Sequence, residues 1–323
     1  MGFNRANLRK IKNEYAGKNL AARESAEARR AELDARFPEV AEIDRELESF
    51  SLEYLAIVAD REHFEENFEK LRQKNLALNG RKRAFLTMNG IAPDYDEVKY
   101  ECPECSDTGY CGIKMCRCMY DRLVRLGYES SGIGKLRDCS FGNFSLDYYN
   151  ETPEVYKNAA HVLNVCRKTA DTFPECSGNL LLLGGTGLGK THLCAAIAGR
   201  VIENGHDVVF ESMENIVGSF EYEKFRRGND TVTESKTDRY FDCDMLIIDD
   251  LGAEMTGNLS SSVLYNIVNT RLINGRGTVI NTNLDPAKIT SVYGERITSR
   301  LFGEYTVLML NGKDIRQKKR KKP

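Results

Sequence analysis

Residues 184–191 read GGTGLGKT, a spacing that could hold the phosphates of a nucleotide. Glycines let the backbone turn so that several N–H groups point at phosphate oxygens. The ammonium of Lys190 would reach the β- and γ-phosphates of ATP, and the hydroxyl of Thr191 would bind Mg²⁺. The alternative is a glycine-rich turn without a ligand. The predicted nucleotide-binding residues are Gly184, Gly185, Thr186, Gly187, Leu188, Gly189, Lys190 and Thr191.

Two carboxylates follow an apolar run about sixty residues later, in the segment MLIIDD. Asp249 at the end of a strand could hold Mg²⁺ through its water shell, and Asp250 could polarise the attacking water. Glu254 lies four residues further on and is a possible helper. The alternative for an acidic pair after a strand is an ordinary turn or helix cap.

A third candidate group is an asparagine near the end of the apolar run 277–281. Asn283 is the candidate for holding the attacking water against the γ-phosphate, and Asn281 is a weaker one because it should still lie within the strand. A loop-starting turn over Asn-Leu-Asp-Pro is the competing interpretation.

Arginines near the C-terminal end could stabilise phosphate charge. Arg296 and Arg300 are spaced i and i+4 on one predicted helix face, which is usually a solvated arrangement. In an ATPase that assembles side by side, one of them can enter the neighbour's site, and Arg316 could act within its own subunit.

A cysteine cluster precedes these motifs. Cys102 and Cys105 form a C-x2-C pair, and Cys116 and Cys118 form a C-x-C pair. Four thiolates in two close pairs suit a structural, tetrahedral Zn²⁺ with no open position for catalysis. Cys111 is a fifth cysteine that could replace one of the four. The alternatives are a redox pair or unrelated free thiols.

The elements that must position these residues alternate from about residue 140 onward. Apolar runs predict strands at 179–184, 207–211, 244–249, 277–281 and 306–310. Helical patterns fall near 190–203, 212–226, 258–274 and 293–302. Repeated alternation of strand and helix predicts an α/β fold with a mostly parallel sheet flanked by helices.

The first ninety residues differ from the rest, because apolar residues recur at helical spacing in an Ala-, Glu-, Lys- and Arg-rich background. They predict two or three long amphipathic helices, either a solvated spacer or a partner-binding module. The predicted segments are 1–96 as a helical partner-binding region, 97–135 as a zinc module and 136–323 as the ATPase domain.

Composition narrows the function classes. The chain has 323 residues and a formal net charge of -2, so no global basic field indicates nucleic-acid binding. A local basic run, 316–322, closes the chain and could touch DNA or simply be solvated. No apolar stretch is long enough to span a bilayer, and the polar first fifteen residues lack the apolar core of a secretory signal, so a cytoplasmic protein with reduced thiols and no membrane contact is expected.

Taken together, several segments resemble the DnaC/DnaI-type replicative helicase loaders, which are AAA+ ATPases related to the IstB-like transposition ATPases. The resemblance covers about 97–316. Its segments are CPECSDTGY with CRC, CSFGNFSLDYYN, NLLLLGGTGLGKTHL, MLIIDDLGAE and YGERITSRLFGEY. The cysteine cluster discriminates most, because IstB-like relatives generally lack it.

The resemblance implies a five-stranded AAA+ sheet and roles for single residues. Asn283 matches the sensor-1 position, Arg300 the arginine finger with Arg296 second, and Arg316 the sensor-2 arginine. The segment around Phe141 and Phe144 resembles the part that packs near the adenine. No motif in residues 1–90 matches the family.

The implied function is ATP-dependent loading of a ring-shaped replicative helicase onto single-stranded DNA, with the N-terminal helices and zinc module gripping the helicase. The implied cofactors are ATP, Mg²⁺ and Zn²⁺, and self-association into ATP-dependent oligomers is expected. One alternative is a transposition helper ATPase that binds duplex DNA. Another is an ATP-driven protein remodeller without a nucleic-acid role.

Overall fold

The computed structural model describes residues 2–59, 63–226, 236–255 and 257–320. It divides into two compact units. One combines residues 1–11 with 119–323, here called the ATPase unit, and the other spans 12–118, here called the helical unit. Within the described ranges, no helix has the length and apolar character that a bilayer crossing requires.

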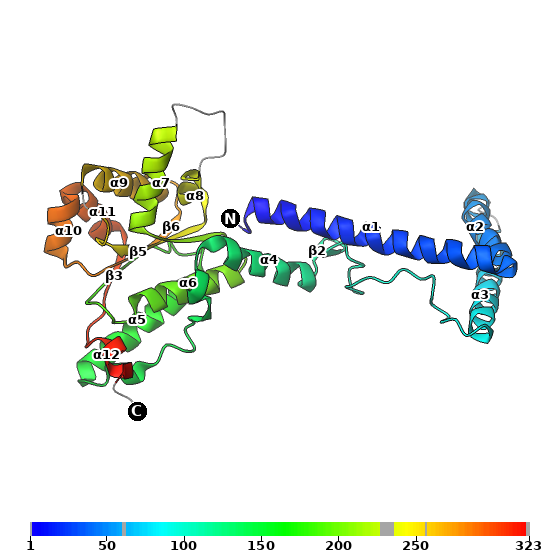
Figure 1. The fold of residues 1–323 in the computed structure, drawn as a ribbon, viewed down its shortest axis with the longest axis horizontal. Helices are drawn as coiled ribbons and strands as arrows, with labels where there is room; N and C mark the ends of the chain where they lie inside the picture. The colour runs from blue at the N-terminus through cyan, green and yellow to red at the C-terminus, as the bar shows by residue number, and fades with distance from the viewer. Residues whose placement is uncertain (1, 60–62, 227–235, 256, 321–323) are drawn as a thin grey trace. The chain divides into compact units, whose positions relative to one another are not determined.

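The ATPase unit is built on a five-stranded sheet in the order β4-β5-β6-β3-β7, with every neighbouring pair parallel (Figure 1). The strands are β3 (Leu180–Leu183), β4 (Val208–Ser212), β5 (Met245–Leu251), β6 (Gly277–Thr282) and β7 (Thr306–Met309). All four residues of β3 are buried, as expected for a central strand covered on both faces. The predicted parallel five-stranded sheet is confirmed.

Helices cover both faces of this sheet because successive strand residues point to opposite sides. Leu180 and Leu182 pack in the core that α5 (Pro153–Thr172) and α6 (Lys190–Glu203) share. Leu181 and Leu183 pack in the opposite core, whose helices are α7 (Met213–Arg226), α9 (Asn258–Ile273), α10 (Pro286–Tyr293) and α11 (Glu295–Glu304). Shorter elements complete the unit: η1 (Gly134–Asp138), η2 (Leu146–Tyr149), α8 (Asp238–Asp242) and α12 (Ile315–Arg320).

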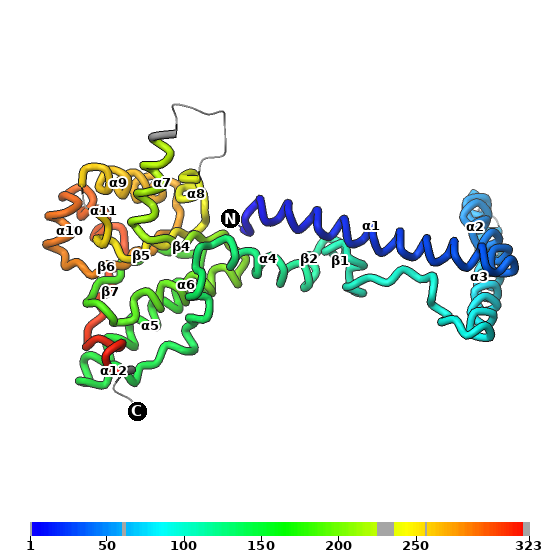
Figure 2. The backbone as a smooth tube through the Cα atoms, viewed as in Figure 1, coloured from blue at the N-terminus to red at the C-terminus, as the bar shows by residue number. Residues whose placement is uncertain are grey.

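The helical unit contains most of α1 (Arg5–Arg36), with α2 (Pro38–Ala59), α3 (Phe64–Met88) and a small hairpin of β1 (Tyr110–Cys111) and β2 (Lys114–Met115). Helices α2 and α3 lie side by side (Figure 2). Leu33, Val40 and Leu86 form a small buried core where the three helices meet. The buried Lys82 donates to the carboxylates of Asp44 and Asp96, so its charge is compensated.

The compact units differ from the three predicted segments for two reasons. The N-terminal residues join the ATPase unit, because Gly2 N–H donates to Asp244 and Asn4 Nδ2 to Asp207 at 2.9 Å. Helix α4 (Arg117–Ser131) also packs there, with the Tyr128 hydroxyl donating to Glu203 at 3.1 Å.

The predicted helix near 293–302 is α11, shifted by two residues, and the sequence analysis missed α10 just before it. Gly294, with φ of +83°, separates the two helices. The residue is the C-cap of α10 and the N-cap of α11, and such a left-handed backbone is one that glycine adopts without strain.

Candidate nucleotide-binding site and metal centre

The glycine-rich loop leaves the end of β3 and enters α6, which begins at Lys190. A Cβ atom at Gly184 would lie 2.3 Å from the Leu310 carbonyl oxygen, and one at Gly187 would lie 2.0 Å from Asp314 Oδ1. At Gly184 the approach of the Leu310 backbone leaves room for glycine alone, and at Gly187 the φ of +76° favours glycine. Ile315 N–H also donates to the Gly187 carbonyl at 2.9 Å, so the start of α12 is held against the loop.

Lys190 and Asn283 come together although 93 residues separate them. The Lys190 ammonium donates to Asn283 Oδ1 at 2.6 Å and to the carbonyls of Gly184 and Gly185, each at 2.9 Å. Burial lowers the pKa of Lys190, and the nearby charges of Asp250 and Asp249 oppose that shift. The predicted phosphate-binding ammonium and the predicted sensor amide therefore lie at one point, where the C-terminal ends of β3 and β6 meet.

The predicted magnesium ligands are also neighbours. Thr191 Oγ1 donates to Asp249 Oδ1 at 3.1 Å. The two oxygens therefore face one position, where the Thr191 hydroxyl would bind Mg²⁺ and Asp249 would hold the ion through its water shell. Burial, followed by the charge of Asp250, raises the pKa of Asp249. When bound, Mg²⁺ would neutralise phosphate charge and restore the ionised form of the carboxylate.

Asp250 stands at a turn in the backbone. Its side chain is exposed and its φ is +51°, while its backbone N–H donates to the side chain of Asn281 at 3.0 Å. An exposed carboxylate beside Lys190 and Asp249 is able to accept a proton from water at this edge of the sheet.

Glu254, the proposed helper, faces elsewhere. It is buried, and it accepts a hydrogen bond from the Tyr293 hydroxyl and one from the Gly252 N–H at 2.8 Å. These bonds hold the segment after β5 against α10, which is a structural use of the carboxylate.

The three predicted arginines fall in two places. Arg316 is the second residue of α12, and its N–H donates to Asp314, which lies against Gly187 of the loop. Its part in the nucleotide site of its own chain stays a prediction. Arg300 lies over the ring of Tyr265, 5.4 Å from the centroid. Arg300, Tyr265 and Arg296 line an open depression beside α11.

The aromatic residues expected near the adenine are buried beneath the loop. Phe144 is stacked against Tyr149 and lies so close to Gly189 that an added Cβ there would be 3.0 Å from its ring. The Tyr149 hydroxyl donates to the Leu188 carbonyl at 2.5 Å, and Phe141 packs in the same core. Their part in adenine binding stays a prediction.

The cysteine cluster forms a second site, within the helical unit. The Sγ atoms of Cys102, Cys105, Cys116 and Cys118 all lie within 4.8 Å of one another. Cys102 and Cys116 are 3.8 Å apart, and Cys105 and Cys118 are 3.6 Å apart. A tetrahedral zinc with Zn–S bonds of about 2.3 Å has edges of about 3.8 Å, so these thiols fit the ion. Cys111 lies outside the cluster, exposed and near the Glu104 carbonyl.

Neighbouring groups hold the cysteine loop in shape. The buried carboxylate of Asp107 accepts the N–H groups of Glu101 and Cys102, each at 2.8 Å. The side chain of Asn19 on α1 donates to the Ser106 carbonyl at 2.7 Å. Such outer contacts orient the ligands of a metal. A bound Zn²⁺ would stabilise this loop against unfolding.

Backbone hydrogen bonds lower the pKa of the Cys102 thiol, which favours the thiolate form that metals bind. Burial instead raises the pKa of the free Cys118 thiol to about 12. A coordinated cation reverses the second effect, since a metal-bound thiol is deprotonated. The thiol chemistry at Cys102 and Cys118 is therefore compatible with zinc.

The glycine-rich loop after β3, the two acids in β5 and the strand β6 placed between β3 and β5 define a protein of the P-loop ATP-binding class. Within that class, residues 156–323 match the model of the IstB-like ATP binding protein family, and the chain belongs to this family.

Named relatives are also similar to this chain. The replicative helicase loader DnaC of Buchnera aphidicola subsp. Baizongia pistaciae is 29% identical over 195 residues, covering 58% of this chain and 74% of that protein. DnaC of Escherichia coli strain K12 is 25% identical over 175 residues, covering 54% and 67%.

Two solved structures are also similar. The crystal structure of the DnaC helicase loader has a TM-score of 0.44 and 22% identity, covering 53% of this chain and 98% of that chain. The crystal structure of DnaI has a TM-score of 0.43 and 19% identity, covering 55% and 91%.

Proposed function

We propose that this protein is an ATP-dependent loader that delivers a ring-shaped replicative helicase to single-stranded DNA when replication starts. The observation that carries the proposal is the combination, in one chain, of a candidate nucleotide site, similarity to proteins named replicative helicase loader DnaC, and a separate helical unit. ATP binding and hydrolysis would time the assembly of the partner ring on DNA.

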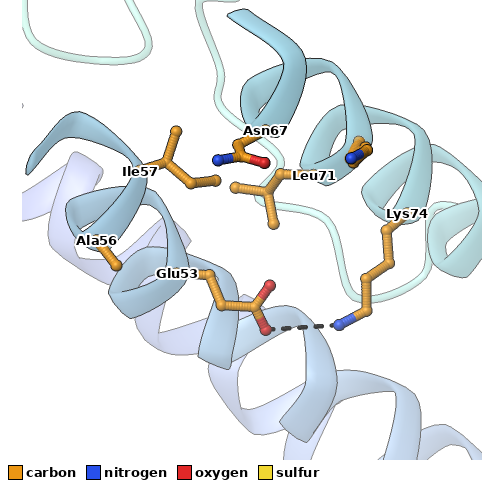
Figure 3. Close-up of a pocket in the computed structure, with 7 residues that line it drawn as sticks. Glu53, Ala56, Ile57, Asn67, Leu71 and Lys74 are labelled. Carbon is orange, nitrogen blue, oxygen red and sulfur yellow. Dashed lines mark hydrogen bonds and ion pairs between the residues drawn. The ribbon is translucent and has the colours of Figure 1, made fainter. Parts of the chain in front are cut away.

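The surface of the helical unit supports a role in binding a protein partner. Leu52 and Leu55 of α2 are 72% and 64% exposed, and Phe68 of α3 is 41% exposed. Between these helices lies a shallow groove of about 350 Å³ (Figure 3). In that view Ile57 and Leu71 lie across the groove from each other, and the Glu53–Lys74 ion pair at 3.5 Å marks one side. Clustered apolar side chains of this kind are typical of protein interfaces.

The arginines support an ATPase that works between subunits. Arg316 follows Asp314 and Ile315, which contact Gly187 of the loop in the same chain, whereas Arg300 lies on the open surface of α11 over Tyr265. We assign Arg300 to the site of a neighbouring copy, where it would stabilise the charge on the γ-phosphate. Single-stranded DNA would then be held by the assembled copies.

A second candidate function is a transposition helper ATPase that binds duplex DNA. The match to the IstB-like family model favours it. The cysteine cluster favours the loader, because it lies outside the matched region and its four thiols are already gathered for a metal.

The test is capture of partners by the full-length chain with ATP, followed by helicase loading on circular single-stranded DNA. We expect the replicative helicase of the source cell in the captured fraction. Loading should be lost in the double variant Leu52→Asp/Leu55→Asp, with ATP binding retained. The matched control is Glu65→Gln/Glu66→Gln, exposed changes at the start of α3. Recovery of a transposase in place of the helicase would reverse the assignment.

A further inference from the structure

Asn281 is a fully buried amide inside β6, two residues before Asn283. A polar side chain in the middle of a sheet needs hydrogen-bond partners, because an unpaired buried amide costs about 1–3 kcal/mol. Its partners are the two acids of the nucleotide site. Nδ2 donates to Asp249 Oδ1, and Oδ1 accepts the backbone N–H of Asp250 at 3.0 Å.

The pairing between β5 and β6 explains why a side chain is needed there. The register is regular from Met245–Gly277 to Ile248–Ile280, and then shifts so that Leu251 pairs with Thr282. Two residues, Asp249 and Asp250, therefore lie in an irregular stretch that the backbone ladder skips. Such bulges re-aim side chains and leave backbone groups without their ladder partner. The side-chain oxygen of Asn281 accepts a hydrogen bond from the Asp250 N–H, which has no partner in the β5–β6 ladder.

The same amide also fixes the direction of the Asp249 carboxylate. Asp249 Oδ1 accepts from Asn281 on one side and from Thr191 Oγ1, at 3.1 Å, on the other. Since the Asn281 amide is planar and bonded at both ends, it cannot rotate without breaking the bond to Asp249 or to Asp250. Its Nδ2 also lies 3.5 Å from Cys194 Sγ.

We infer that Asn281 is a positioning residue that holds Asp249 toward Thr191 for Mg²⁺ and fixes the backbone from which Asp250 projects. This inference rests on the proposed ATP site. Partners outside the first ligand layer orient metal ligands in this way, and their loss typically costs 10–100-fold in metal affinity or activity. Asn283, which contacts Lys190, has the separate role of meeting the phosphate end of the site.

The experiment compares two asparagines that make the same kind of bond at opposite ends of the sheet. Asn179 is also buried, and its Oδ1 accepts the Thr278 N–H of β6 at 2.9 Å, but it lies before β3 instead of at its C-terminal end. Asn281→Leu and Asn179→Leu both remove a buried cross-strand amide. Only Asn281→Leu removes an amide that contacts Asp249 and Asp250.

The readout is binding of Mn²⁺, measured by electron paramagnetic resonance on the full chain with ADP. We expect Asn281→Leu to weaken Mn²⁺ binding roughly 10–100-fold and to leave metal-free ADP binding within about threefold of wild type. Asn179→Leu should lower thermal stability and leave Mn²⁺ binding unchanged. If Asn281→Leu does not fold, Asn281→Ala takes its place, since it adds no bulk to the strand.

Two outcomes separate the inference from the proposal beneath it. Wild-type Mn²⁺ affinity in a folded Asn281 variant, or an equal loss in Asn179→Leu, would overturn the positioning role alone. If Lys190→Ala bound ADP as well as wild type, the nucleotide site itself would be misassigned.

Discussion

The cysteine cluster and the nucleotide site are two candidate ion sites built in different ways. The four thiols come from residues 102–118, a short segment that contains a loop, a two-stranded hairpin and the start of α4. The nucleotide site gathers groups from residue 184 to residue 316, on three strands and two helices. In the first, short chain segments and a metal can define the geometry. In the second, only the folded sheet brings Lys190, Asp249 and Asn283 together.

Because the two sites are built in different ways, the loss of a residue should have different consequences in each. Loss of a bound zinc would remove the cross-link between the two cysteine pairs, which lie in the helical unit, so damage should stay within that unit. Loss of one nucleotide-site residue should change chemistry while the sheet, with its two apolar cores, stays folded.

The largest effect is expected for the cysteines. Cys105→Ser should abolish stoichiometric zinc, and it should open residues 97–118 to protease, because the remaining ligands hold a structural zinc poorly. Metal analysis and limited proteolysis measure the two results. Cys111→Ser is the matched control, since Cys111 lies in the same loop but outside the cluster.

ATP binding by the Cys105→Ser protein decides whether the two sites are independent. We expect it to match wild type. Loss of ATP binding together with zinc would show that the two sites depend on each other. Absence of zinc from the wild-type protein would contradict the assignment of the metal site.

The next effect is that of the phosphate-binding ammonium. Lys190→Ala should reduce ATP hydrolysis by roughly 10³-fold or more and weaken nucleotide binding, because the site loses the charge that faces the phosphates. Zinc content should not change. Lys288→Ala, an exposed lysine on α10, is the control and should hydrolyse ATP normally. Equal turnover in both variants would contradict the site assignment.

A smaller effect is expected for the arginine that acts between subunits. Arg300→Ala should lower ATP hydrolysis roughly 10²-fold while ATP binding persists. Mixing it with Lys190→Ala subunits should restore part of the turnover, since those subunits still supply Arg300 to their neighbours. Arg296→Ala, one turn earlier on α11, should lower ATP hydrolysis much less than Arg300→Ala. Failure of the mixture to recover any activity would place Arg300 outside the neighbour's site.

Local sequence predicted each site to a different extent. The spacing of the cysteines and of GGTGLGKT was sufficient to find their residues, because neighbours in sequence are neighbours in space within a loop. Apolar runs also located the five strands to within two residues at every end. The register shift at Asp249 and Asp250 has no sequence signature, so the contacts of Asn281 could not be derived beforehand.

Other features also depended on tertiary structure. Docking of residues 2–11 on the ATPase unit requires Asp207 and Asp244 to reach the same edge of the sheet. In the sequence Glu254 was a candidate for catalysis, since it lies close to Asp249 and Asp250. In the structure its carboxylate accepts a hydrogen bond from the Tyr293 hydroxyl on α10. Sequence therefore identifies groups capable of chemistry, and the fold decides which of them share a site.

The smallest effect concerns stability and sharpens the contrast between the sites. Burial and Asp250 raise the pKa of Asp249, so in metal-free protein the folded state holds a proton more tightly than the unfolded state. Stability from this group is present below the unfolded pKa and is lost as pH rises through the folded pKa. Asp249→Asn should thus stabilise the protein at neutral pH by about 1 kcal/mol while removing Mg²⁺-dependent hydrolysis. Thermal unfolding in the presence of a chelator measures this effect, and the gain in stability of Asp249→Asn should vanish near pH 4. A variant less stable than wild type at pH 7 would show that the Asp249 carboxylate stabilises the fold.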